Sequence, residues 1–190
     1  MTMTAHPLNA DRLKGTNLYL VGMMGAGKST LGQHLAQQLS YRFFDTDALI
    51  EQAAGQTIPE IFDQSGEEAF RDLETQVLTQ LSPYTRLVVG TGGGIVLRRQ
   101  NWGQLCHGVV IWLDVPLVEL EQRLKGDESR PLLQRPDWSE HLAKLLDDRR
   151  RLYQEADIHL TVNPGESVEA IAQRLMTMLN NRLQSAHVGE

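Results

Sequence analysis

A glycine-rich segment near the amino terminus has the residue types needed to bind the phosphates of a nucleotide. The segment GMMGAGKST, Gly22–Thr30, fits the pattern G-x-x-x-x-G-K-[ST] and lies between an apolar run and an amphipathic helical pattern. Glycines let backbone N–H groups turn inward around the phosphates, and the start of the following helix adds positive potential. The pattern predicts nucleotide contacts at Gly25, Ala26, Gly27, Lys28, Ser29 and Thr30.

Two side chains of this segment would do the chemistry. Lys28 is placed to reach the β- and γ-phosphates, and the Ser29 hydroxyl is placed to bind Mg²⁺. The pattern predicts nucleotide binding without naming a reaction. A kinase, a GTPase switch and an ATP-driven machine all remain open at this point.

Two carboxylates follow the second apolar run. Asp45 and Asp47, in FFDTD, are two residues apart, so one can face the metal while the other faces an acceptor hydroxyl. Phosphoryl transfer to an alcohol requires a group that holds the attacking oxygen and takes its proton. The alternative that Asp47 only caps the helix over 48–55 is left open.

Basic side chains that could bind an anionic acceptor occur in two helical patterns. Arg71 and Glu74, in FRDLE, are three residues apart on one helix face, where the carboxylate can hold the guanidinium in place. Arg149, Arg150 and Arg151 end a long helical pattern beside LY. Because most charged runs on helices are solvated, we expect only one of these three arginines to have a specific role.

A third apolar run ends in glycine. The segment LVVGTGGGIVL, Leu87–Leu97, places Gly92, Gly93 and Gly94 where a strand should end. Bare backbone at this position lets a peptide N–H approach a small ligand that a side chain would otherwise exclude.

Five apolar runs alternate with helical patterns, which predicts a three-layer α/β/α fold with a five-stranded parallel sheet. Ligands of such sheets collect at the carboxyl ends of the strands, where the glycine-rich loop, the two aspartates and the glycine triplet fall. The strands are expected at 17–21, 41–45, 86–89, 109–113 and 157–162, and the main helices at 31–39, 48–55, 67–81, 137–156 and 167–179.

Length and composition limit the remaining possibilities. The chain has 190 residues, so we expect one domain over 17–183, between a flexible arm at 1–16 and a flexible tail at 184–190. The formal net charge is -6, so we expect no nucleic-acid partner. The single cysteine, Cys106, excludes an internal disulfide and is expected in the core. No apolar run is long enough for a membrane span, so we expect a cytoplasmic protein without a membrane partner. We expect a monomer because the chain is small and nothing in the sequence indicates a large exposed apolar patch.

The motifs together resemble those of shikimate kinases. The resemblance rests on the phosphate loop, DTD at 45–47, GEEAFRDLE at 66–74, the glycine triplet, RPLL at 130–133 and RxxLY at 149–153, in the family's order and approximate spacing. It covers the chain from Asn17 to about Met178. It implies a P-loop kinase that uses ATP and Mg²⁺ to phosphorylate the 3-hydroxyl of shikimate, in the pathway to chorismate and the aromatic amino acids.

The resemblance also implies roles around the acceptor. Asp47 matches the aspartate that binds the ring hydroxyls and acts as base. Arg71 and Arg149 match the two arginines that bind the shikimate carboxylate, and Gly93 matches the glycine whose backbone N–H lies against the substrate.

Further matches concern the nucleotide and its metal. Asp45 matches the aspartate that holds Mg²⁺ through water, and Arg123 is similar to the arginine that stacks near adenine. Arg130 matches the catalytic arginine of a lid, here expected over Lys125–Pro136, that closes over the phosphates beside Lys28. The segment around Pro164, at the family's adenine loop, departs from the pattern because it has no arginine.

Other functions predict different pockets. A nucleoside monophosphate kinase would need a base-stacking acceptor pocket and more phosphate-binding arginines. A gluconate kinase is the other alternative of the same architecture, and a neutral sugar acceptor would leave Arg71 and Arg149 without a carboxylate to bind. A catalytically silent relative would lack Lys28, Asp47 or the arginines, and all of these are present.

Overall fold

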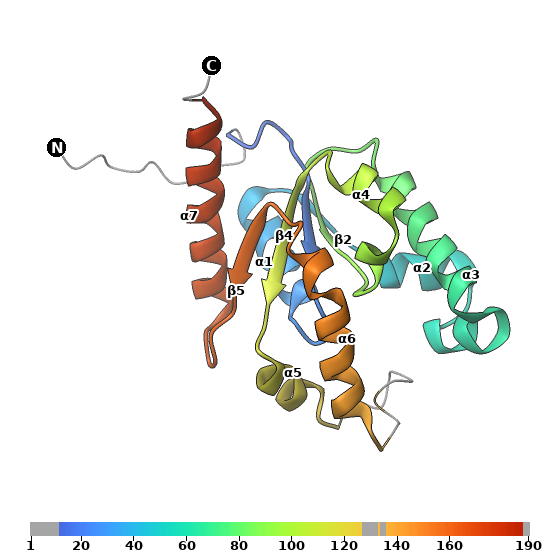
Figure 1. Cartoon of the computed structure of the whole chain (residues 1–190). Helices are drawn as coiled ribbons and strands as arrows, with labels where there is room; N and C mark the ends of the chain where they lie inside the picture. The colour runs from blue at the N-terminus through green and yellow to red at the C-terminus, as the bar shows by residue number, and fades with distance from the viewer. Residues whose placement is uncertain (1–11, 127–132, 134–135, 188–190) are drawn as a thin grey trace.

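Five parallel strands form the centre of the molecule in the computed structural model, which describes residues 12–126, 133 and 136–187 (Figure 1). The sheet order is β2-β3-β1-β4-β5, so the strand after the first helix lies at one edge and the last strand at the other. This confirms the predicted fold class. The strands are β1 Leu18–Val21, β2 Arg42–Asp45, β3 Leu87–Gly90, β4 Val109–Asp114 and β5 Ile158–Thr161.

Helices cover both faces of this sheet, with α1 and α7 on one side of the strands and α4 and α6 on the other (Figure 1). The long helical patterns of the sequence are all present, whereas η1, α4 and α5 were not expected. The helices are α1 Lys28–Leu39, α2 Thr46–Ala54, α3 Ile58–Leu81, η1 Ile95–Leu97, α4 Arg99–Leu105, α5 Leu117–Leu124, α6 Trp138–Tyr153 and α7 Val168–His187.

Burial explains why the strands form where they do. All four residues of β1 and of β3 are buried, as expected for strands covered on both faces. The edge strand β2 is less buried, and it packs against α1 and α2. The sheet is therefore most deeply buried at its centre, next to the phosphate loop and the glycine triplet.

The helix α3 has two parts. It starts at a capping box in which Thr57 and Glu60 satisfy each other's backbone N–H groups. Gly66 then interrupts the helix with φ 79 and ψ 177, so the chain changes direction before the FRDLE segment. The helix predicted over 67–81 corresponds to the second part.

Residues on both sides of the expected domain boundaries take part in packing. Leu13 belongs to the buried core, Arg12 donates a hydrogen bond to Asn180, and α7 continues to His187. The division into arm, domain and tail stays a prediction. The expectation for Cys106 is wrong, because this residue follows α4 on the surface and its thiol donates only to the Gly103 carbonyl.

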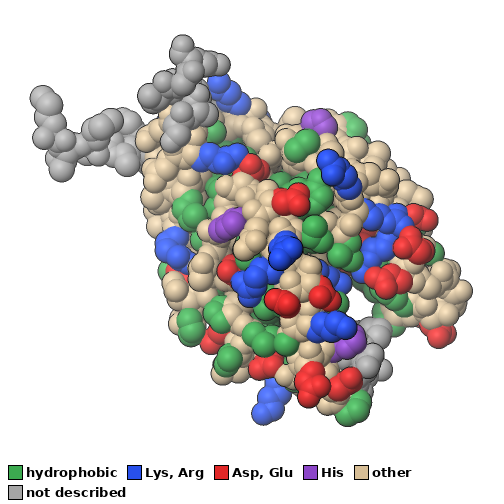
Figure 2. All heavy atoms as spheres, in the orientation of Figure 1, with side chains coloured by type: hydrophobic (Ala, Val, Ile, Leu, Met, Phe, Trp, Pro, Cys, Tyr) green, Lys and Arg blue, Asp and Glu red, His purple; other side chains and the backbone are tan. Residues whose placement is uncertain are grey.

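The surface agrees with the charge balance of the sequence. Acidic and basic side chains are interspersed over the face shown in Figure 2. No helix in the described part of the chain is long and apolar enough to cross a membrane.

Candidate active site

The phosphate loop joins β1 to α1 in a conformation that requires glycine. Gly22, Gly25 and Gly27 have φ values of 141, 75 and 91, which side chains disfavour. The Lys28 ammonium donates to the Gly22 and Met23 carbonyls at 2.9 and 2.8 Å. The loop is therefore preformed, with its lysine beside the backbone that would surround the phosphates.

A cavity of about 570 Å³ opens beside this loop. It contains all six residues assigned to the nucleotide, together with Asp45, Asp47 and Arg123. The Arg123 guanidinium lies 3.5 and 3.4 Å from the Gly25 and Ala26 carbonyls. Residues at and before the start of α7 also line the cavity, and the sequence patterns gave no reason to select them: Glu166, Val168 and Ile171.

Asp45 connects the loop to the first turn of α2. Its Oδ1 accepts hydrogen bonds from the Asp47 and Ala48 N–H groups at 3.0 and 3.4 Å, so Asp45 is the N-cap of α2. The alternative that Asp47 caps this helix is therefore wrong. The Ser29 hydroxyl donates to Asp45 Oδ2 at 2.6 Å, which brings together the two oxygen ligands predicted for Mg²⁺.

Asp47 and Glu74 meet over Gly92. A Cβ atom on Gly92 would lie 2.6 Å from both Asp47 Oδ1 and Glu74 Oε1, so only glycine fits there. The Glu74 side chain is fully buried, and its Oε1 has no hydrogen-bond partner among the described residues. Burial raises the pKa of the Glu74 carboxyl and Asp47 raises it further, while Arg71 opposes both.

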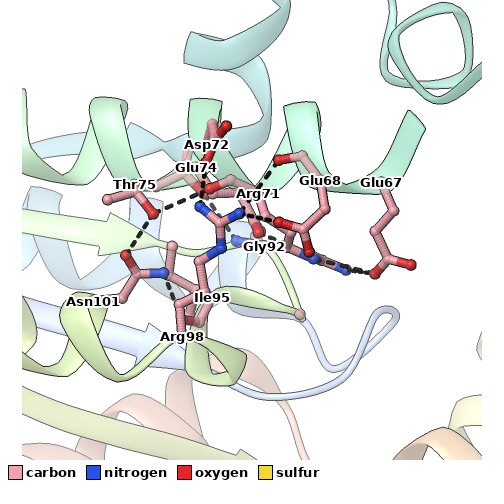
Figure 3. A network of polar contacts seen from close by, with 12 residues as sticks. Glu67, Glu68, Arg71, Asp72, Glu74, Thr75, Gly92, Ile95, Arg98 and Asn101 are labelled. Carbon is pink, nitrogen blue, oxygen red and sulfur yellow. Dashed lines mark hydrogen bonds and ion pairs between the residues drawn. The ribbon is translucent and has the colours of Figure 1, made fainter. Parts of the chain in front are cut away.

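Arg71 lies between two carboxylates and against the glycine triplet (Figure 3). Its Nη1 donates to Glu74 Oε2 at 2.6 Å, and its Nη2 donates to Glu67 Oε1 at 2.8 Å. Burial alone would lower the pKa of Arg71, but the two glutamates raise it above its ordinary value. A Cβ atom on Gly94 would lie 2.0 Å from Arg71 Nη1, so this glycine leaves the space that the guanidinium occupies.

Arg149 approaches the same triplet from α6. It is buried, unlike Arg150 and Arg151, and its Nη1 lies 3.5 Å from the position of a Cβ atom on Gly93. Below it, the Tyr153 hydroxyl donates to the Gly93 carbonyl at 2.7 Å. Burial raises the pKa of Tyr153 to about 12, so the phenol keeps its proton.

Gly92 and Gly94 are needed for space, and none of the three glycines is needed for its conformation. None of the three has a positive φ. The Gly92 N–H donates to the Thr46 hydroxyl at 2.8 Å. Within the described part of the chain, the Gly93 N–H has no hydrogen-bond partner. This N–H can therefore donate to a ligand.

A second layer of polar contacts fixes the triplet and its following turn on α3 (Figure 3). Arg98 pairs with Glu68 and Asp72 at 2.6 and 2.5 Å. Asn101 donates to the Ile95 carbonyl and accepts from the Thr75 hydroxyl. No motif indicated Arg98, Asn101 or Thr75, since their contacts join segments far apart in the sequence.

The structure thus brings together Asp47, Arg71, Gly93 and Arg149 on the acceptor side, and Lys28, Ser29, Asp45 and Arg123 on the nucleotide side. Arg130 and most of the expected lid lie outside the described residues.

Comparisons with known proteins agree on one family. The sequence model described as shikimate kinase matches residues 24–180. The shikimate kinase of Microcystis aeruginosa is 51% identical over 177 residues, which are 93% of this chain and 93% of the relative. That of Thermosynechococcus vestitus is 53% identical over 169 residues, which are 89% and 92% of the two chains.

Solved structures give the same result. A shikimate kinase from Acinetobacter baumannii in complex with shikimate is 38% identical, with a TM-score of 0.82 over 92% of this chain and 97% of that one. A gluconokinase from Sinorhizobium meliloti matches the fold with a TM-score of 0.61, over 93% and 98% of the two chains, at only 14% identity. The gluconate kinase alternative is therefore not favoured. This chain belongs to the shikimate kinase family.

Proposed function

We propose that this enzyme transfers the γ-phosphate of ATP to the 3-hydroxyl of shikimate, which yields ADP and shikimate 3-phosphate for chorismate biosynthesis. The observation that carries the proposal is the meeting of two buried arginines, Arg71 and Arg149, with the carboxylate of Asp47 around the glycine triplet. A small acceptor that has both a carboxylate and hydroxyl groups fits this set of charges.

Each residue then has a separate task. Arg71 and Arg149 bind the acceptor carboxylate, the Gly93 N–H donates to the acceptor, and Asp47 holds the attacking hydroxyl and takes its proton. Lys28, together with Arg130, stabilises the charge on the transferred phosphoryl group. Ser29 and Asp45 would hold Mg²⁺, which neutralises phosphate charge when bound.

The reaction is tested by coupled ADP release with shikimate, gluconate and CMP as acceptors, with and without Mg²⁺. We expect Mg²⁺-dependent turnover with shikimate alone. Turnover with gluconate or CMP, and none with shikimate, would overturn the proposal.

The role of Asp47 is tested by Asp47→Asn, which keeps the shape of the side chain and removes its ability to accept a proton. We expect kcat to fall by about 10²–10⁴-fold while the affinity for ATP is unchanged. Asp63→Asn, the same change at an exposed position on α3, is the matched control. A near-native kcat in Asp47→Asn would exclude Asp47 as the base.

We further propose that the enzyme acts as a cytoplasmic monomer. The exposed Cys106 thiol is compatible with a reducing compartment. Sedimentation velocity at assay concentrations measures the oligomeric state, and a dimer would contradict the proposal.

A further inference from the structure

Glu67 occupies one edge of the Arg71 guanidinium. The Arg71 Nη2 and Nε atoms both donate to Glu67 Oε1, at 2.8 and 3.3 Å. A carboxylate binds a guanidinium most strongly through two parallel N–H donors, and Nε with Nη2 is one such pair. In the structure this pair already faces a carboxylate from the protein (Figure 3).

The two glutamates that pair with Arg71 differ in how easily their ion pairs can break. The Glu74 side chain is fully buried, so breaking its ion pair would leave a buried carboxylate that water cannot solvate. The Glu67 side chain is 61% exposed, so water can solvate its carboxylate as soon as it separates from the arginine. Exposed ion pairs of this kind stabilise a protein only weakly. Glu74 is therefore a fixed partner of Arg71, and Glu67 is a displaceable one.

We propose that Glu67 competes with the acceptor carboxylate for Arg71 and so weakens the binding of every carboxylate at this position. The inference rests on the proposed role of Arg71 in binding that carboxylate. An acceptor that also bonds Asp47 and the Gly93 N–H offsets the cost of displacing Glu67 with the contacts of its hydroxyl groups. A simple anion that binds only through its carboxylate meets the same cost without those contacts, so its affinity for the site stays low.

The test is Glu67→Gln, which removes the competing charge and keeps the length of the side chain. We expect the KM for shikimate to fall about two- to fivefold, the range that an exposed ion pair contributes. Inhibition by cyclohex-1-ene carboxylate, an analogue without hydroxyl groups, should strengthen by a similar or larger factor. The kcat and the KM for ATP should stay unchanged.

The neighbouring Glu68→Gln is the matched control. It removes the same charge from the same helix, and the Glu68 side chain is 88% exposed, but its partner is Arg98. If a general change in the field of the site caused the effect, the two variants would lower the KM equally. Equal shifts would overturn the inference, and so would a raised KM in Glu67→Gln, which would mean that Glu67 holds Arg71 in place for the substrate.

Arg71→Lys separates this inference from the proposed function. If Arg71→Lys raises the KM for shikimate while Glu67→Gln does not lower it, the acceptor site stands and the competition is wrong. If Arg71→Lys leaves the KM unchanged, Arg71 does not bind the acceptor and both ideas fail.

Discussion

Around the glycine triplet, carboxylates and guanidinium groups lie close together. Asp47 lies beside Glu74, and Glu74 accepts a hydrogen bond from Arg71. Arg149 acts to lower the pKa of both Glu74 and Tyr153. In a site shielded from water, each charge shifts the protonation of its neighbours. The raised pKa of Glu74 therefore makes the stability of the fold depend on pH.

Burial and Asp47 raise the pKa of Glu74 in the folded enzyme above its ordinary value of 4.5. The folded protein then holds this proton more tightly than the unfolded chain does. The resulting stabilisation is fully present below about pH 4.5 and is lost as the pH rises through the folded pKa. The Tm of the wild type relative to Glu74→Gln should fall as the pH increases from 4.5 to 7.

Calorimetry of both proteins at matched pH values measures this difference, and the contributions of other carboxylates cancel in it. A constant difference would mean that Arg71 holds Glu74 ionised throughout.

At the scale of elements, the turn after β3 joins the two halves of the acceptor site. Gly92 leaves room for Asp47 and Glu74, and Gly94 leaves room for Arg71. A Cβ atom on Gly93 would make only ordinary contacts, the nearest at 3.5 Å. Gly92 and Gly94 thus leave space that charged side chains occupy, whereas Gly93 leaves space that a methyl group could fill.

Alanine at each position of the triplet separates these roles. Gly92→Ala and Gly94→Ala should each destabilise the fold by about 1–3 kcal/mol, because a methyl group displaces buried charged groups. Gly93→Ala should stay within about 0.5 kcal/mol of the wild type. Urea denaturation measures all three, and equal losses would show that the turn requires glycine for a reason other than space.

Sequence patterns predicted the elements whose signals are local. Apolar runs and the glycine-lysine loop located all five strands and the nucleotide side of the site. The short helix α5 was missed because it spans only Leu117–Leu124, barely two turns. Roles that depend on distant contacts were also missed: Tyr153 bonds to Gly93, 60 residues away, and nothing in either segment indicates the other.

At the scale of the whole molecule, the residues assigned to the two ligands come from different elements. Those assigned to the acceptor lie on α2, on α3, in the turn after β3 and on α6, and those assigned to the nucleotide and its metal lie in the loop after β1, on α1, at the end of β2 and on α5. The buried centre of the sheet carries the loop and the triplet between them. Each ligand should therefore stabilise the fold through its own set of residues.

Lys28→Ala tests this separation. A non-hydrolysable ATP analogue with Mg²⁺, at 100 times its Kd, should raise the Tm of the wild type by about 5–10 °C. In Lys28→Ala that shift should be lost, while the shift caused by shikimate persists, because Lys28 belongs to the phosphate loop and its ammonium donates to the Gly22 and Met23 carbonyls of that loop. Scanning fluorimetry with each ligand measures both, and loss of the shikimate shift as well would show that the two sets of residues are not independent.

The two hydrogen-bonding roles of the Asp45 carboxylate limit the residues that position 45 can carry. One oxygen of the carboxylate caps α2, and the other accepts the Ser29 hydroxyl. Asparagine or serine would cap α2 but would lack the negative charge of the carboxylate. Glutamate would keep the negative charge but is too long to cap the helix. In a library of all substitutions at position 45, selected for growth without aromatic amino acids, aspartate alone should survive. Selection for folded protein alone should also retain asparagine and serine.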